Sequence, residues 1–146
     1  MSDSGPIRVV LDTNVLVAAA RSRQGASFAV INAIPAVEFR PCLSVGLYAE
    51  WQEVLTRPEN LPPHRTPADA LAFLRFLISQ SHLQEIHFLW RPFLSDADDD
   101  MVLELAVAAG CRYIITHNVA DFRGSEQFGV AAISPSRFLR LMRSQP

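Results

Sequence analysis

Short apolar runs and longer amphipathic stretches alternate along this chain. The first run, Ile7–Leu11, is rich in β-branched residues and is typical of a strand that is buried on both faces. Comparable runs later in the chain predict further strands at residues 38–43, 86–89, 112–116 and 130–133. The stretches between these runs are long enough for helices, which favours parallel strands joined by helical crossovers.

The stretches between the runs carry helix start and stop signals. Serine, threonine and aspartate precede them as N-caps, and glycine or proline follows several of their ends. The predicted helices open at residues 12–14, cover 27–34, extend from Ser44 to about Thr56 and from Thr66 to about Ser81, follow the acidic cluster 96–100 as far as Gly110, and begin again at Ser134. Alternating strands and helices predict a single α/β domain, residues 1–146, with a mainly parallel sheet covered on both faces.

The composition narrows the class of protein. The chain has 146 residues and a mass of 16.2 kDa, with 49% hydrophobic and 19% charged residues and a mean hydropathy of +0.15. It is too apolar for a disordered chain and too mixed for a membrane protein. The longest apolar run, residues 15–20, is far shorter than the roughly 20 residues of a membrane helix, and no signal-peptide pattern precedes the first strand. We therefore expect a soluble, cytoplasmic protein.

The cysteine and lysine counts exclude several chemistries. Cys42 and Cys111 lie beside predicted strands and lack metal-ligand spacing, so we expect reduced, buried thiols. The thirteen lysine-plus-arginine positions are all arginine, which excludes Schiff-base catalysis and a Walker-type phosphate lysine. A net charge of −2 does not by itself indicate a polyanionic partner.

Acidic residues gather at the predicted carboxyl ends of the strands. Asp12 ends the first strand, Asp121 follows the fourth by a short loop, and the cluster 96–100 follows the third. Functional residues collect at this edge of a parallel sheet. Each acid has a simpler interpretation alone, since Asp12 suits a helix cap and Asp121 a turn. Several carboxylates at one edge would repel one another and need a cation, and their hard oxygen ligands select Mg²⁺ or Mn²⁺ over zinc.

The predicted helix after Ser44 adds one candidate to this group. Glu50 lies at the border of its apolar stripe, from which a carboxylate can reach a cleft, whereas Glu53 points nearly opposite and is expected to be solvated. Glu50 taken alone is also compatible with an ordinary surface glutamate.

The helix that ends at Gly110 offers two further candidates. Asp99 lies on the flank of its buried side, and Asp98 also projects inward if the helix starts early, so geometry does not separate them. Either could instead be an N-cap favoured by the helix dipole. Asp100 is expected to pair with Glu104 on the outer face.

Four segments of the chain resemble the PIN-domain nucleases, in the same order. They are VVLDTNVLVAA at 9–19, SVGLYAEWQEVLTRP at 44–58, DADDDMVLELAVAAG at 96–110 and YIITHNVADFRG at 113–124. The last is similar to the terminal segment of toxin-type members, the VapC-like toxins of type II toxin–antitoxin pairs. The resemblance implies a PIN-like three-layer sandwich, with a mainly parallel central sheet flanked by helices.

The same resemblance implies a metal-dependent endoribonuclease that hydrolyses RNA phosphodiesters with Mg²⁺ or Mn²⁺. It assigns the acid of the third segment to Asp99. Cations held at such a site would activate water and neutralise the leaving oxygen. The expected catalytic and metal-binding residues are Asp12, Glu50, Asp99 and Asp121, with secondary roles for Thr13, Asn14, Asp96 and Asn118.

One position departs from the family pattern. Many PIN-domain nucleases carry an acid where this chain has Asn118, so the fourth carboxylate would be Asp121. This departure leaves an alternative open, a PIN-like RNA- or protein-binding module with a degraded, non-catalytic site. The resemblance further implies a cognate antitoxin whose basic segment fills the acidic cleft, and a homodimer.

An acidic site repels RNA, so RNA must be bound by other residues. Candidate phosphate contacts are Arg21, Arg23, Arg112, Arg123 and the row Arg137, Arg140 and Arg143, although that row also suits a solvated helix face.

Two other classes fit the residues poorly. A phosphatase with an aspartate nucleophile would need an acid two residues after Asp12, where Asn14 stands, and a lysine. A flavodoxin-like nucleotide binder would need a glycine-rich phosphate loop after a strand.

Overall fold

The computed structural model describes residues 5–87 and 93–144, and its centre is a five-stranded parallel sheet. Val9 at the centre lies between Pro41 on one neighbouring strand and Tyr113 on the other. The strands follow the order β3-β2-β1-β4-β5, and they are β1 (Ile7–Leu11), β2 (Phe39–Leu43), β3 (His82–Leu83), β4 (Tyr113–Ile115) and β5 (Ala131–Ile133). The predicted parallel α/β domain is therefore confirmed.

In the described ranges, six α-helices connect or follow these strands. They are α1 (Thr13–Arg21), α2 (Ala26–Asn32), α3 (Val45–Leu55), α4 (Pro67–Ser79), α5 (Ala97–Ala108) and α6 (Pro135–Arg143), with short 3₁₀ turns η1 (Pro58–Asn60), η2 (Val119–Phe122) and η3 (Ser125–Phe128). The predicted caps are in place: the side chains of Ser44 and Ser134 accept backbone N–H groups of α3 and α6, and Thr66 forms a capping box with Asp69. These caps satisfy backbone donors at the helix starts.

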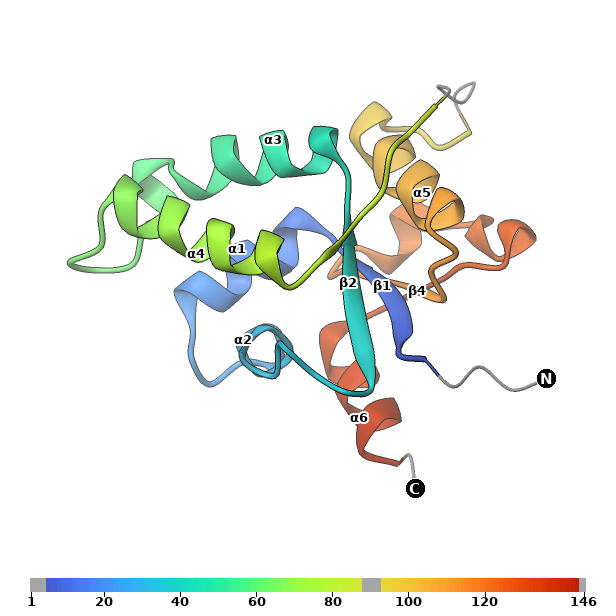
Figure 1. The fold of residues 1–146 in the computed structure, drawn as a ribbon, viewed down its shortest axis with the longest axis horizontal. Helices are drawn as coiled ribbons and strands as arrows, with labels where there is room; N and C mark the ends of the chain where they lie inside the picture. The colour runs from blue at the N-terminus through green and yellow to red at the C-terminus, as the bar shows by residue number, and fades with distance from the viewer. Residues whose placement is uncertain (1–4, 88–92, 145–146) are drawn as a thin grey trace.

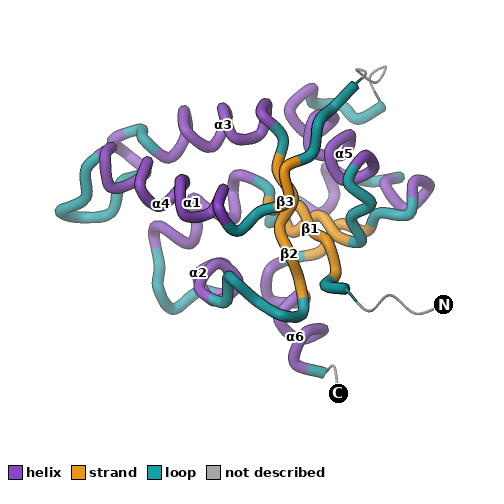
Figure 2. The backbone as a smooth tube through the Cα atoms, viewed as in Figure 1, coloured by secondary structure: helices purple, strands orange, loops and turns teal. Residues whose placement is uncertain are grey.

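The helices cover the sheet in two layers, as expected for a three-layer sandwich. Figure 1 shows the strands standing between α1 to α4 on one side and α5 on the other, and Figure 2 shows the same separation. Helix α5 packs on β1, β2 and β4, whereas α6 returns to pack against α2. Because all strands are parallel, their carboxyl ends share one edge, at which α1, α3 and α6 begin.

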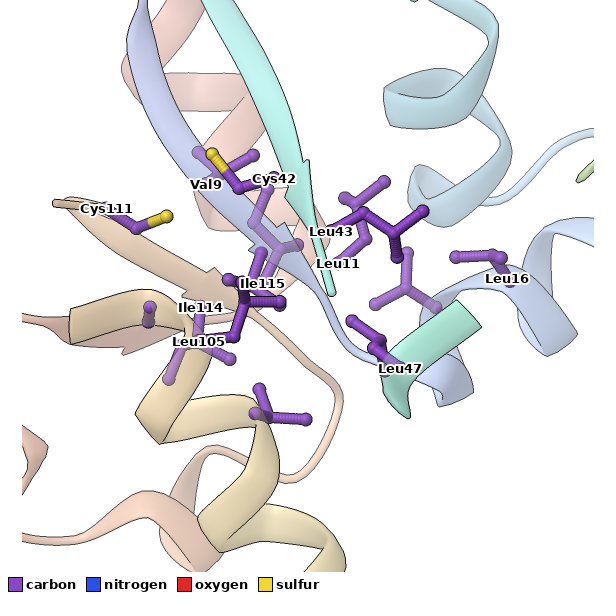
Figure 3. Packing of buried hydrophobic residues seen from close by; sticks show 14 of the residues in the cluster. Val9, Leu11, Leu16, Cys42, Leu43, Leu47, Leu105, Cys111, Ile114 and Ile115 are labelled. Atoms are coloured by element: carbon purple, nitrogen blue, oxygen red, sulfur yellow. The ribbon is translucent and has the colours of Figure 1, made fainter. Parts of the chain in front are cut away.

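The core lies on both faces of the central strand. Val9, Val10 and Leu11 are completely buried, which explains why β1 is apolar at consecutive positions rather than at alternate ones. Figure 3 shows Leu11 close to Leu43, and Ile115 and Leu105 beside them. Cys42 and Cys111 are free and buried, which confirms the expectation of reduced core thiols.

The strand predicted at residues 86–89 is wrong. Ile86 and His87 lie in a loop, and residues 88 and 89 lie outside the described part of the chain. The third strand is instead β3, where His82 pairs with Cys42 and Leu83 with Leu43. This strand is two residues long at the edge of the sheet, and Leu83 is 62% exposed, so it needs no apolar run. The apolar run therefore predicted the third strand at the wrong residues, because an edge strand does not require apolar side chains.

Within the described ranges, no helix is long and apolar enough to cross a membrane.

Candidate functional site

A groove of about 1040 Å³ lies at the carboxyl edge of the sheet. Its walls come from the length of α1 and of α3, the start of α5 and the turn η2, so segments distant in sequence meet there. All eight residues singled out from the sequence line it: Asp12, Thr13, Asn14, Glu50, Asp96, Asp99, Asn118 and Asp121. Asp98 lines the same groove.

Asp12 directly follows the last residue of β1 and is the N-cap of α1. Its Oδ1 accepts the backbone N–H of Thr13 at 2.9 Å, as a cap does. Its Oδ2 accepts the hydroxyl of Thr116 at 2.8 Å and the side-chain amide of Asn14 at 3.3 Å. These bonds hold the carboxylate in one orientation. Burial raises the pKa of Asp12, and the hydrogen bonds from Thr116 and Thr13 oppose that rise.

Thr116 is a site residue that sequence reasoning missed. It is fully buried, and its hydroxyl donates to Asp12 while accepting the backbone N–H of Asn118 at 3.0 Å. The pairing of Leu11 with Ile115 places residues 12 and 116 side by side at the sheet edge. The signal that could have found Thr116 is this register between β1 and β4, which no local pattern contains.

Glu50 reaches the groove from the middle of α3. The Thr13 hydroxyl donates to its carboxylate, so the first turn of α1 is tied to α3. Burial raises the pKa of Glu50, and the negative charges of nearby aspartates, Asp98 first among them, act in the same direction. Glu53 is 71% exposed and pairs with Arg57 at 3.2 Å, which confirms the expectation that it is solvated.

The acidic start of α5 places three carboxylates in the groove, Asp96, Asp98 and Asp99. Asp96 is the N-cap of α5 and accepts the backbone N–H of Asp98 at 2.8 Å. Because α5 begins as early as Ala97, both Asp98 and Asp99 line the groove, so the alternative left open between them is not decided by their position.

Asp99, in the first turn of α5, has a strongly raised pKa. Burial, followed by the charges of neighbouring aspartates, raises the pKa of Asp99 from its ordinary 3.8 to about 6. The aspartates that act on it are Asp12, Asp96, Asp121 and Asp98, from three different segments. This coupling shows that acids distant in sequence lie within electrostatic reach of one another.

The expected pairing of Asp100 with Glu104 on the outer face is wrong. Asp100 accepts the backbone N–H groups of Phe93 at 3.2 Å and Leu94 at 2.9 Å, which closes the turn before α5. Glu104 is only 7% exposed and is therefore on a buried side of the helix. Helix α5 is covered by the sheet and by η2, so its apolar stripe is wider than the sequence pattern indicated.

The turn after β4 brings the last two predicted residues to the groove. Asn118 precedes η2, and its carbonyl accepts the backbone N–H of Asp121 at 3.0 Å. The loop is fixed to α1 and α2, because His117 donates its backbone N–H to Asn14 at 3.1 Å and its ring contacts the Ser27 hydroxyl at 2.7 Å. Asp121 itself is exposed at the groove surface.

The donor set suits a hard divalent cation. Carboxylate oxygens are the ligands preferred by Mg²⁺ and Mn²⁺, and a cation would relieve the burial and repulsion that raise the pKa values of Asp12, Glu50 and Asp99. Among residues 5–87 and 93–144, no three histidine, cysteine or acidic side chains stand close enough to enclose an ion.

Comparison with known proteins gives a family and a fold. Residues 8–120 match the family described as PIN domain. The fold is similar to that of a chain in the crystal structure of VapBC2 from Rickettsia felis bound to a DNA fragment from their promoter. The two share 12% sequence identity and a TM-score of 0.59, over 88% of this chain and 98% of that one. No curated protein matches the sequence.

Proposed function

Because this chain belongs to the PIN domain family, we propose that it is an endoribonuclease that hydrolyses RNA phosphodiesters with Mg²⁺ or Mn²⁺. The observation that carries the proposal is the groove itself, where carboxylates from four segments meet and the pKa values of Asp12, Glu50 and Asp99 are raised. Such an arrangement is costly for a protein without a cation, and it is an arrangement that phosphodiester chemistry uses.

In this proposal Asp12, Glu50, Asp99 and Asp121 hold the cation. When bound, the cation would activate water and neutralise charge on the phosphate oxygens. The Thr116 hydroxyl and the Asn14 amide orient the carboxylate of Asp12, and the Thr13 hydroxyl orients Glu50. Their hydrogen bonds place ligand oxygens before a cation arrives, which lowers the cost of assembling the site. Leu11 and Ile115, at the strand ends beneath the groove, are fully buried and exclude water from that side.

The test is cleavage of single-stranded RNA by the purified protein. We expect cutting with Mg²⁺ or Mn²⁺, none in EDTA, and none from Asp12→Asn or Asp99→Asn. Asp100→Asn is the matched control for Asp99, because it removes the neighbouring charge on the same helix outside the groove. Cleavage in EDTA by protein free of contaminating nuclease would contradict the proposal.

We further propose that the protein is the toxin of a toxin–antitoxin pair and acts in the cytoplasm. The similarity in fold to a chain of the VapBC2 assembly supports an antitoxin partner, and the acidic groove suits a basic segment of that partner. Expression of the wild type should arrest growth of a bacterial host, and Asp12→Asn should not. Equal toxicity of the two, or none from either, would remove the support for a toxin. A homodimer is expected, and light scattering of the purified chain measures it.

The second candidate is a binding module of the same fold without catalysis. Asn118 in the groove favours it, since an amide contributes no charge to a cation. Titration calorimetry separates the two candidates: a binding module would show no uptake of Mg²⁺ or Mn²⁺ by the wild type, whereas the nuclease would bind at least one ion that Asp12→Asn loses.

A further inference from the structure

The groove continues beyond the carboxylates, between α1 and α3. Residues spaced by three or four lie on one face of a helix, and such a row on α1 runs from Asn14 through Val17 to Arg21. The matching row on α3 runs from Glu50 to Val54, and Arg57 continues it just past the helix end. The two helices pack side by side, so the groove has acids at one end and arginines at the other.

The two ends are separated by about two helical turns. Arg21 is seven positions after Asn14, and at 1.5 Å per residue this is roughly 10 Å along the axis of α1. The floor between them is made of short apolar side chains, among them Val17, Ala18 and Val54. A phosphodiester chain whose reacting phosphate lies at the carboxylates can therefore lie along this floor and bring a neighbouring phosphate to Arg21.

Arg21 is held in position without being neutralised. Its Nη2 donates to the side-chain oxygen of Asn60 at 2.9 Å, and Asn60 is buried and donates in turn to the Val54 carbonyl at 2.9 Å. In the part of the chain that the structure describes, no carboxylate lies within ion-pair distance of Arg21. Its positive charge and its remaining N–H groups are therefore available to an anion.

Arg57, at the same end of the groove, differs from Arg21 because its guanidinium already has an acidic partner. It pairs with Glu53 at 3.2 Å, so part of its charge is already compensated. A phosphate at this end would meet an unpaired guanidinium on α1 and a paired one beyond α3. Arg21 is consequently the stronger contact.

We propose that Arg21 binds a backbone phosphate of single-stranded RNA, one or more nucleotides away from the bond that is cut. The inference rests on the proposed nuclease function and adds the direction in which the substrate leaves the carboxylates, along α1 toward its carboxyl end. The acidic end attracts RNA only through a cation, whereas the arginine end attracts it directly. Arg21 is therefore the residue that lets this acidic groove accept a polyanion.

Binding of a single-stranded RNA in the presence of Ca²⁺, in place of Mg²⁺ or Mn²⁺, tests the contact without relying on activity. Fluorescence anisotropy in Ca²⁺ at several salt concentrations should show Arg21→Ala binding about tenfold more weakly than the wild type. The slope of log K against log salt should fall in magnitude by about 0.7, the value for one lost contact to a single strand. Arg21→Lys should keep most of the slope, because it keeps the charge.

Arg75→Ala is the matched control. Arg75 is exposed on α4 and does not line the groove, so its removal changes net charge equally. Equal effects of Arg21→Ala and Arg75→Ala, or no effect of either, would overturn the inference. An unchanged thermal midpoint of Arg21→Ala would show that the loss of RNA affinity is not caused by unfolding. If the midpoint does fall, recovery of RNA affinity by Arg21→Lys shows that the positive charge is what binds RNA.

Cleavage kinetics then separate this inference from the function on which it rests. If the wild type cuts RNA, Arg21→Ala should raise KM and leave kcat nearly unchanged for a long substrate. A dinucleotide whose only phosphate is the one that is cut offers no neighbouring phosphate to Arg21, so the variant and the wild type should cut it equally. A wild type that cuts while Arg21→Ala behaves identically on both substrates overturns only the role of Arg21. A wild type that neither cuts RNA nor binds a divalent cation overturns the nuclease itself.

Discussion

The strand core around Leu11 and the groove that begins at Asp12 are one peptide bond apart, yet their side chains are in opposite energetic situations. Leu11 is completely buried among apolar neighbours, and its burial stabilises the fold. Asp12 is also buried, but burial raises its pKa and so disfavours its charged form. The fold therefore uses the stability of its central strand to hold carboxylates in a place that they would not occupy on their own.

The largest effect on stability is expected in the core. Leu11→Ala should lower the free energy of unfolding by about 2–5 kcal/mol, because it removes buried methyl groups and leaves a cavity under the site. Urea unfolding followed by circular dichroism measures the loss. Val37→Ala is the control, since Val37 is 90% exposed and its change should stay within about 0.5 kcal/mol. If Leu11→Ala lowers the free energy of unfolding as little as Val37→Ala does, β1 is not the centre of the core.

Adding a divalent cation should offset the unfavourable burial and mutual repulsion of the groove carboxylates and so stabilise the folded protein. A ligand that binds only the folded state raises the free energy of unfolding by about 2.7 kcal/mol at a concentration of 100 times Kd. We expect Mg²⁺ or Mn²⁺ to raise the thermal midpoint of the wild type and to leave that of Asp12→Asn nearly unchanged. An equal rise in both proteins would place the cation somewhere other than at Asp12.

Removing the hydroxyl that orients Asp12 should have a smaller effect. Thr116→Val keeps the shape of the side chain but removes the bond to Asp12 and leaves the Asn118 N–H without this acceptor. We expect a loss of about 1–3 kcal/mol in the free energy of unfolding and weaker cation binding. Thr116→Ser retains the hydroxyl and should restore cation affinity in calorimetry. If Thr116→Val binds cations as tightly as the wild type does, Thr116 has no orienting role.

The smallest effect is expected from Asp99, because this side chain is partly exposed and solvent screens its charge. Its pKa is raised from 3.8 to about 6, so between these values the folded state binds more protons than the unfolded state. The stability of the metal-free protein should therefore rise as pH falls from about 6 to about 4, and should decline as pH rises through the same window. Asp99→Asn should stabilise the metal-free protein above pH 6.

Thermal midpoints in EDTA across this pH range measure the effect of Asp99. The difference between the wild type and Asp99→Asn isolates this carboxyl from others, such as Asp69, whose lowered pKa acts in the opposite direction. Asp100→Asn should follow the pH profile of the wild type. A difference that does not change with pH would show that the titration of Asp99 is not coupled to folding.

Much of the fold around the strand core and the groove could be predicted from the sequence, because it depends on local signals. The apolar run at Ile7–Leu11 marked the central strand, and the caps at Ser44, Thr66 and Ser134 marked three helix starts. The same pattern failed at residues 86–89, since the two-residue edge strand His82–Leu83 is set by pairing with β2 rather than by its own apolar content.

Some residues of the candidate site could likewise be identified from the sequence, and others could not. The acids Asp12, Glu50, Asp99 and Asp121 were identified from their positions at strand ends, on a helix border and in segments that resemble the PIN domain. Their roles as metal ligands remain predictions. The link from Thr116 to Asp12 and the burial of Glu104 were missed, because each depends on packing between elements far apart in the chain.

Most of the strands and helices, several helix caps and the residues with suitable chemistry could be predicted from the amino-acid sequence, since these depend on neighbours a few positions away; the edge strand β3 could not. The tertiary structure alone decided how close the acids come, which threonine orients Asp12, and that Arg21 shares a groove with them. The physical reason is that electrostatic coupling and hydrogen bonding act over ångströms in space, and only strand register and helix packing bring residues 12, 50, 99 and 116 within that range.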